Sequence, residues 1–213
     1  MGKGVASIKG IAGWAYQLLG SAGDQIAYKR GVDFSNWVSQ EEAGFNNKRG
    51  NQYQPSSIPP LKRALARYHI QGQDVLIDIG CGKGKVMSFC ARRYPFSAVR
   101  GLELSPRLAE TARKNFDLLG LKQCEVICGD AMTFTDYDSC NFLYMFNPFP
   151  EDVFKAALKN ISESLRRCPR KCVLIYMNPV YHQMIEDETP FRLKHTVKAI
   201  TSWFSCNCYE YDP

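Results

Sequence analysis

The chain has 213 residues, of which 45% are hydrophobic and 23% charged, and this makeup is typical of one globular domain with a single well-buried core. Its net charge of +6 comes from scattered lysines and arginines, whereas a nucleic-acid-binding surface normally has a denser basic stretch interleaved with aromatic residues. Nine cysteines without a Cys-x-x-Cys pair argue against a disulfide scaffold or a zinc ribbon. We therefore expect reduced thiols, no metal site and a cytoplasmic location.

The first sixty residues are expected to form an extension of the domain. Residues 5–20 are apolar and glycine-rich, but Lys9 interrupts them and the remaining run is too short to span a bilayer, so we expect no membrane association. Their apolar side chains recur near helical spacing, which predicts a helix packed on the domain. A targeting segment cleaved near residues 21–23, Ser-Ala-Gly, stays open as the alternative. Residues 24–60 are polar and turn-rich, which favours a lid. The expected division is an N-terminal helical and lid extension, residues 1–60, and a main domain, residues 61–213.

From residue 61 onward the hydrophobic pattern alternates between helices and strands. Helices are predicted at residues 61–68, 85–94, 106–119 and 151–167, and strands at 75–77, 98–102, 125–128, 141–145 and 172–177. The strands are near-continuous runs of Val, Ile and Leu, as a parallel sheet covered on both faces requires. Residues 191–200 and 203–211 look like two strands joined by a short connection, hence an antiparallel pair at the sheet edge. The pattern predicts a doubly wound α/β fold.

A glycine-rich loop follows the first of these strands and precedes a helix. Residues 78–85 read Asp-Ile-Gly-Cys-Gly-Lys-Gly-Lys, and glycines at such a place let backbone N–H groups approach a ligand closely. A nucleotide-triphosphate loop needs Ser or Thr after its Lys, but Lys85 is followed by Val86. A dinucleotide loop needs glycine where Lys85 stands. Because the Asp78 carboxylate would repel phosphate and attract an ammonium or sulfonium group, the loop favours a positively charged ligand.

Two further acidic residues end the next two predicted strands. Glu103 ends the second strand, where a carboxylate can accept both hydroxyls of a ribose. Asp130 ends the third strand, where it could accept from an adenine amino group while Ala131 donates its backbone N–H. Each acid taken alone is typical of a helix N-cap or a solvated turn. Three acids at successive strand ends indicate one nucleoside-binding crevice.

The series Asp-x-Gly-x-Gly-x-Gly, Glu103 and Asp130 resembles the motifs of the class I S-adenosylmethionine (SAM)-dependent methyltransferases, over residues 53–178. This resemblance implies a seven-stranded sheet of order 3-2-1-4-5-7-6 with an antiparallel C-terminal strand, and SAM as the cofactor. It implies that Asp78 lies near the methionine ammonium, Glu103 at the ribose and Asp130 near adenine. The other implied cofactor contacts are Gly80, Cys81, Gly82, Gly84, Leu104 and Ala131.

Residues 53–57 resemble the Tyr-x-Pro-Ser/Thr stretch that precedes the core in some members, including the Dot1-like lysine methyltransferases. The resemblance implies that this stretch folds over the cofactor. Tyr53 and Ser56 are accordingly expected to contact SAM.

The predicted acceptor side follows the fourth strand. Residues 146–150, Phe-Asn-Pro-Phe-Pro, resemble the Asn/Asp-Pro-Pro-aromatic motif of methyltransferases that modify planar or amide nitrogens, although Phe149 stands where the second proline belongs. The resemblance implies that Asn147 and a carbonyl near Pro148 accept hydrogen bonds from the target amine while the aromatic ring stacks on it. The other interpretation is a turn stiffened by its prolines. Asn178 and Pro179 repeat the Asn-Pro pair after the fifth strand.

These features predict a SAM-dependent methyltransferase that acts on a nitrogen nucleophile, first of all a protein lysine or another amine. A nucleic-acid base and a small-molecule acceptor stay open as alternatives. A rival hypothesis from another class is a catalytically silent module of the same fold that binds a partner protein.

Overall fold

The computed structural model describes residues 31–34, 37–45, 49–199 and 205–213, so the predicted helix within residues 5–20 lies outside the described residues. The strands are β1 (Val75–Ile79), β2 (Ala98–Glu103), β3 (Cys124–Cys128), β4 (Phe142–Phe146), β5 (Cys172–Met177), β6 (Arg192–Val197) and β7 (Cys206–Tyr211). The helices are α3 (Gln40–Ala43), α4 (Ile58–Leu65), α5 (Lys85–Arg93), α6 (Pro106–Leu119), α7 (Glu151–Arg167) and α8 (His182–Glu188).

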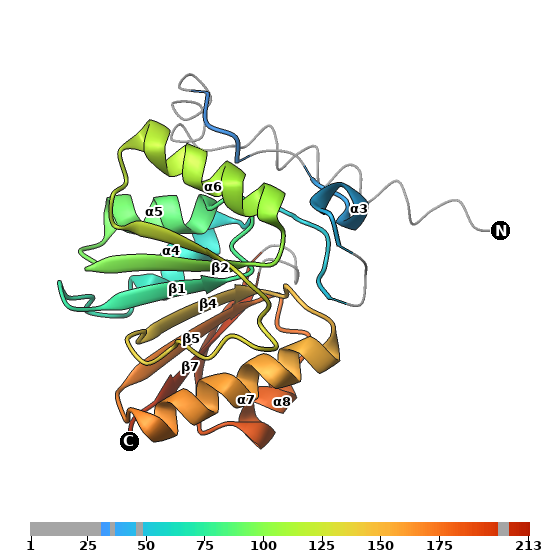
Figure 1. The fold of residues 1–213 in the computed structure, drawn as a ribbon. Helices are drawn as coiled ribbons and strands as arrows, with labels where there is room; N and C mark the ends of the chain where they lie inside the picture. Colours follow the sequence, from blue (N-terminus) through green and yellow to red (C-terminus); the bar gives the residue numbers. More distant parts are fainter. Residues whose placement is uncertain (1–30, 35–36, 46–48, 200–204) are drawn as a thin grey trace.

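All seven strands form one sheet of order β3-β2-β1-β4-β5-β7-β6 (Figure 1). Strands β1 to β5 are mutually parallel, whereas β7 runs antiparallel to β5 and β6 antiparallel to β7. The predicted α/β class, strand order and antiparallel edge pair are therefore confirmed. In a parallel sheet of this kind, ligands bind beyond the carboxyl ends of the strands where the strand order reverses, which here is between β1 and β4.

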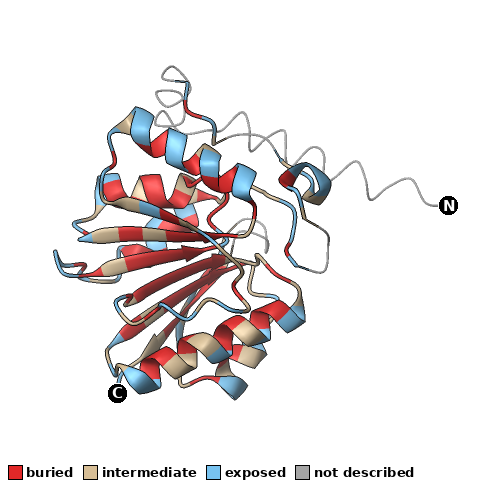
Figure 2. Ribbon diagram, in the orientation of Figure 1, coloured by how far each residue is buried: buried red, intermediate tan, exposed pale blue. Residues whose placement is uncertain are grey.

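Helices cover both faces of the sheet. Helices α4, α5 and α6 pack on one face, and α7 and α8 pack on the other (Figure 1). Successive residues of a strand point to opposite faces, so Leu76 of β1 belongs to the first core cluster and Ile77 and Ile79 to the second. The central strands are buried along nearly their whole length (Figure 2). The near-continuous runs of Val, Ile and Leu are thus explained by a sheet that has two apolar faces.

The element boundaries differ from the predicted ones by up to three residues, and one helix was not predicted. Helix α4 begins at Ile58, three residues before the predicted start, because Ser57 is its N-cap and the two prolines fit in its first turn. The helix therefore crosses the predicted boundary between extension and domain. Helix α8 was not predicted, since Ile185 is its only buried residue and so short a helix carries no apolar periodicity. None of the helices in the described ranges is long and apolar enough to span a membrane.

The described residues just ahead of α4 lie over the end of the sheet. After α3, residues 49–56 form a segment, here called the strap, that lines the same pocket as the glycine loop. An antiparallel bridge between Val38 and Tyr53, with hydrogen bonds of 3.2 and 3.0 Å, ties the strap to the residues before α3. Within the described residues, the strap is thus a packed part of the domain.

Candidate functional site

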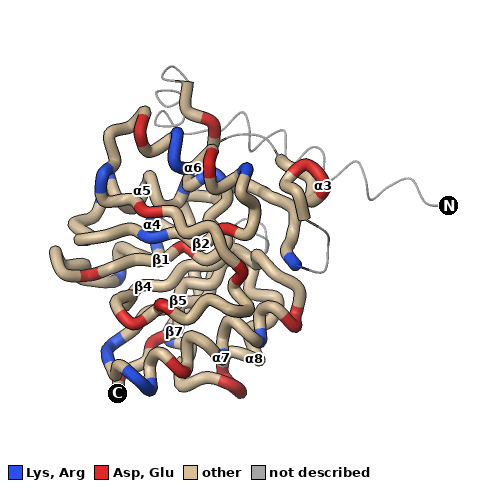
Figure 3. The backbone as a smooth tube through the Cα atoms, in the orientation of Figure 1, with Lys and Arg blue, Asp and Glu red and all other residues tan. Residues whose placement is uncertain are grey.

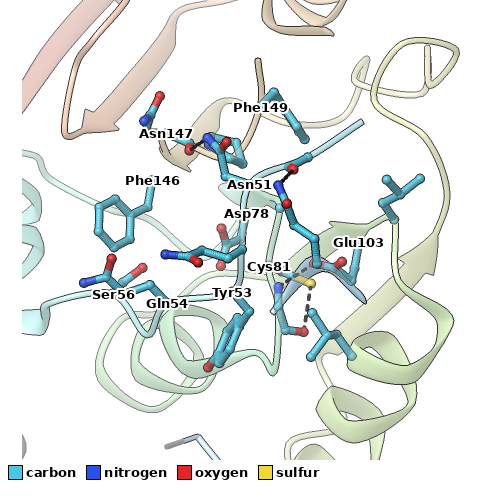
Figure 4. A pocket seen from close by; sticks show the side chains of 18 of the residues that line it. Asn51, Tyr53, Gln54, Ser56, Asp78, Cys81, Glu103, Phe146, Asn147 and Phe149 are labelled. Carbon is cyan, nitrogen blue, oxygen red and sulfur yellow. Dashed lines mark hydrogen bonds between the residues drawn. The ribbon is translucent and has the colours of Figure 1, made fainter. Parts of the chain in front are cut away.

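A cavity of about 350 Å³ opens beyond the carboxyl ends of the central strands (Figure 4). Its size falls within the range of small-molecule sites, roughly 300–1,000 Å³. Its walls are the glycine loop after β1, the end of β2, the strap, and the loop after β4, here called the acceptor loop (residues 146–150). The lining includes these residues that the sequence singled out: Tyr53, Ser56, Asp78, Gly80, Cys81, Gly82, Glu103, Leu104, Asn147, Pro148 and Phe149. Gly84, Asp130 and Ala131 are not part of it.

The glycine loop is shaped by backbone conformations that favour glycine. Gly80, Gly82 and Gly84 have φ values of +84°, +54° and +79°. A Cβ on Gly80 would stand 2.5 Å from the Cβ of Pro148, and one on Gly82 would collide with the Tyr53 ring. Gly84 faces away from the cavity, since a Cβ there would collide with the Phe116 ring of α6. The first two glycines therefore let the strap and the acceptor loop approach, and the third lets α5 pack close to α6.

Glu103 ends β2 with its side chain directed at the glycine loop. One carboxylate oxygen accepts the backbone N–H of Gly82 and the other accepts that of Ser105, both at 2.8 Å. The residue is 6% exposed, and burial raises the pKa of its carboxyl, although these backbone N–H groups oppose the rise. Each oxygen retains a second lone pair that can receive a ligand hydroxyl.

Asp78 lies in the middle of the cavity, between Glu103 and Asn147 (Figure 4). It is 3% exposed, and burial, together with the negative charge of Glu103, raises its pKa well above the ordinary value. Among the described residues no group donates a hydrogen bond to its side chain. A buried carboxyl without a donor is unfavourable unless a ligand supplies one, and a cationic N–H donor would do so best.

Lys83 connects the glycine loop to residues far ahead of it in the sequence. Its ammonium lies 2.7 Å from a carboxylate oxygen of Asp33 and 5.4 Å from the ring centre of Tyr53. The Tyr53 hydroxyl in turn donates to the main-chain oxygen of Phe34 at 3.0 Å. These contacts hold the Tyr53 ring against the loop. Sequence reasoning missed Lys83 and Asp33, because nothing in the spacing of the two residues relates one to the other.

Asp130 sits beside the cavity, behind a strap residue. Its carboxylate accepts the backbone N–H of Met132 at 2.9 Å and pairs with the guanidinium of Arg49 at 3.1 Å. Arg49 itself lines the cavity. Ala131 is buried, and its carbonyl receives the side-chain amide of Asn160 at 3.4 Å. A contact of Asp130 or Ala131 with adenine therefore stays a prediction.

The acceptor loop presents its residues differently from what its motif implied. Asn147 has a φ of +36°, and its Oδ1 accepts the Tyr176 hydroxyl at 3.2 Å. Phe149, the expected stacking ring, is only 6% exposed and belongs to the core cluster beneath α7. Phe146 is the more exposed aromatic residue, and it lies on the same side of the cavity as Asn147, opposite Glu103 (Figure 4). The lining also includes residues that were not predicted to contact a ligand, among them Arg49, Asn51, Gln54 and Phe146.

Comparison with known proteins agrees with this geometry. Residues 76–168 match the model of a family described as "Methyltransferase domain". The trans-aconitate 2-methyltransferase of Methylobacterium radiotolerans is 28% identical over 164 residues, which cover 76% of this chain and 58% of that protein. The chain thus spans less than two thirds of the length of this curated relative.

Solved structures share the fold. An RNA methyltransferase from Salinibacter ruber in complex with S-adenosyl-L-homocysteine has a TM-score of 0.53 and 20% identity, with 74% of this chain and 92% of that chain covered. MtNAS in complex with MTA and tNA has a TM-score of 0.55 and 20% identity, with 72% and 58% covered. The resemblance indicated by the sequence motifs is confirmed over residues 76–168, which match a methyltransferase-domain model, and the solved structures share the fold of this chain.

Proposed function

We propose that this protein binds SAM in the cavity and transfers its methyl group to an acceptor that enters beside the acceptor loop. The observation that carries the proposal is the pair of buried carboxyls, Asp78 and Glu103, at the ends of two adjacent parallel strands. In their ionised forms both would repel a phosphate. SAM fits this donor set, because it offers an ammonium, a sulfonium and a ribose diol within one molecule.

Each part of the site has a distinct role in the proposal. Asp78 receives the methionine ammonium, and Glu103 receives the ribose hydroxyls through its remaining lone pairs. The backbone of the glycine loop, at Gly80, Cys81 and Gly82, lies close to the aminoacid part of SAM. Leu104, the residue after Glu103, lies beside the ribose. Tyr53 and Ser56 close the site from the strap side. Asp130 and Ala131 lie toward adenine, next to Arg49.

The chemistry is a displacement, and the bound cofactor supplies an electrophilic methyl group on its sulfonium. The work of the chain is therefore to hold the two reactants in line and to exclude water. Positioning of this kind accounts for a large part of the acceleration of a bimolecular step. The carboxyls of Asp78 and Glu103 keep the sulfonium nucleoside at one end of the cavity, and Asn147 faces the acceptor at the other.

Two kinds of acceptor follow from different observations. A nitrogen nucleophile, such as a protein lysine or another amine, is favoured by the resemblance of residues 53–57 and of the Asn147–Phe149 motif. A small carboxylic acid is favoured by the relatives whose names give trans-aconitate as the substrate. A nucleic-acid base is the weaker alternative, since in the view of Figure 3 the Lys and Arg residues are spread over several elements among Asp and Glu.

Isothermal titration with SAM and S-adenosylhomocysteine tests the proposal. We expect micromolar binding of both, and no binding of ATP at the same concentrations. The matched variants are Asp78→Asn in the cavity and Asp117→Asn on the exposed face of α6. The first should weaken SAM binding and the second should not. Absence of SAM binding by the unmodified protein would instead favour a catalytically silent module.

A further inference from the structure

The strap residue Asn51 donates hydrogen bonds to two consecutive carbonyls of the acceptor loop. Its backbone N–H donates to the main-chain oxygen of Pro148 at 2.8 Å, and its side-chain Nδ2 donates to the main-chain oxygen of Asn147 at 2.7 Å. Figure 4 shows Asn51 beside Asn147. The motif would offer an amine the Pro148 carbonyl together with the side-chain oxygen of Asn147. An incoming amine would therefore have to share the Pro148 carbonyl with Asn51 or displace it.

The third oxygen of the acceptor loop is also engaged. The fully buried Tyr176 donates its hydroxyl proton to Asn147 Oδ1 at 3.2 Å. Burial raises the pKa of Tyr176, and the nearby backbone N–H groups of Tyr181 and Val180 oppose that rise. The hydroxyl keeps its proton, which is directed at Asn147.

The orientation of the Asn147 amide follows from this contact. With Oδ1 held by Tyr176, the amide nitrogen Nδ2 points elsewhere, and no acceptor for it is found within the described part of the chain. The acceptor loop therefore offers a pair of N–H donors to whatever binds beside it. A group that receives hydrogen bonds suits this arrangement, whereas a group that donates them does not.

The groups around Asn147 also bear on the proton balance. Gln54, Ser56 and Phe146 lie on its side of the cavity, and none of their side chains is a base near neutral pH (Figure 4). The carboxyl of Asp78, which also lines the cavity, receives the methionine ammonium in the proposed function. An amine with an ordinary pKa of about 10.4 would arrive protonated and would need such a base. A carboxylic acid, with an ordinary pKa of about 4, arrives ionised with a lone pair ready to react.

From these contacts we propose that the acceptor is a small carboxylic acid. We further propose that Asn51 is a specificity-determining residue, which favours the acid over an amine at this site. This inference rests on the proposed function. One carboxylate oxygen attacks the methyl carbon while Asn147 Nδ2 holds the other oxygen. A C–O bond forms as the C–S bond breaks, and the bonding pair goes to sulfur. The negative and positive charges cancel, no proton moves, and the products are a methyl ester and S-adenosylhomocysteine.

The stability of the transferred methyl group in alkali distinguishes the two acceptor classes. The full chain is incubated with SAM tritiated in its methyl group and either the small-molecule fraction of a cell extract or a panel of di- and tricarboxylic acids. The products are then treated with mild alkali. An ester releases volatile tritiated methanol, and this is the result we expect for most of the label. Label that stays on an alkali-stable product overturns the inference, as does SAM binding without transfer to any acid.

Failure of the proposed function would give a different result, because SAM itself would then not bind in the titration described above.

The variant Asn51→Asp replaces the donor amide by an acceptor and should lower kcat/KM for the acid about tenfold, the equivalent of one lost hydrogen bond. Tyr176→Phe releases Asn147 Oδ1 and should raise the KM for the acid by a similar factor. The Kd for SAM should change less than twofold in both.

Gln73→Ala, on the exposed loop before β1, is the matched control and should change neither the KM for the acid nor the Kd for SAM. If Asn51→Asp and Tyr176→Phe leave the KM for the acid unchanged, their contacts with the acceptor loop are only structural and the inference is wrong.

Discussion

The carboxylate of Glu103 and the backbone N–H of Gly82 meet at 2.8 Å, so the end of β2 is fastened to the loop that follows β1. The same carboxylate accepts the N–H of Ser105, the N-cap of α6. One side chain thereby fixes both the shape of the glycine loop and its own orientation. A ligand that enters the cavity meets a carboxylate whose position is already set, which lowers the entropy that binding must overcome.

The first prediction concerns Glu103→Gln. The variant keeps the shape of the side chain, but its NH₂ group must face one of the two backbone N–H donors, and the negative charge is lost. We expect the Kd for SAM to rise about 10- to 100-fold, in line with hydrogen bonds to charged groups of about 1.5–3 kcal/mol. Titration calorimetry measures this. Glu110→Gln on the exposed face of α6 is the control, and equal Kd values for the two variants would contradict the role of Glu103.

The second prediction separates binding from turnover. Asn147→Ala removes the side chain that faces the acceptor but leaves Asp78 and Glu103 in place. We expect the Kd for SAM to stay within about twofold, while kcat falls about 100-fold because the acceptor loses its alignment. Single-turnover transfer and calorimetry give the two quantities. If Asn147→Ala and Glu103→Ala damage binding and turnover equally, this division of roles is wrong.

The third prediction concerns pH and Asp78. Burial and the charge of Glu103 raise the pKa of Asp78 above its ordinary value of 3.8. The folded, ligand-free protein then holds a proton that the unfolded chain has already lost, so this residue's contribution to stability is lost as the pH rises from 3.8 through the folded pKa. Asp78→Asn should therefore gain stability relative to the unmodified protein between pH 5 and pH 8, as measured by urea unfolding.

Binding of SAM should change with pH in the opposite direction. The ionised carboxyl is the form that attracts the ammonium, so the affinity of the unmodified protein should increase with pH over the same range, and that of Asp78→Asn should not. A constant stability difference between the two proteins across this range would show that Asp78 has an ordinary pKa.

The fourth prediction concerns the glycine loop. Gly80 and Gly120 both have positive φ values, +84° and +68°, but only at Gly80 would a Cβ meet another residue, 2.5 Å from the Cβ of Pro148. Gly120→Ala should lower the free energy of unfolding by about 1 kcal/mol through backbone strain alone. Gly80→Ala adds a steric clash and should lower it by about 3 kcal/mol. It should also weaken SAM binding, which Gly120→Ala should not, and similar losses in both would contradict this packing.

The sequence predicted the parts of this protein that depend on local pattern. Asp78, Glu103 and the glycines between them could be found because each stands at a fixed offset from the end of a strand, and strand ends converge in a parallel sheet. The strand order followed from the resemblance that these residues carry. The apolar runs of β1 to β5 were found for the same reason, since burial on both faces leaves a clear signal.

The contacts of Asn51, Lys83 and Arg49 could not be predicted, because their partners Asn147, Asp33 and Asp130 lie at distances in the chain that no local rule relates. The burial of Phe149 and the partial exposure of Phe146 depend on how α7 packs against the sheet. Helix α8 was missed because one buried residue, Ile185, gives no periodicity.

A crystal structure of the protein with S-adenosylhomocysteine would test the central claim most directly. We predict density for the ligand in the cavity, with its amino group within hydrogen-bonding distance of Asp78 and its ribose hydroxyls on Glu103. Density for the ligand elsewhere, or a cavity filled by the strap with both carboxyls turned away from the ligand, would contradict the account.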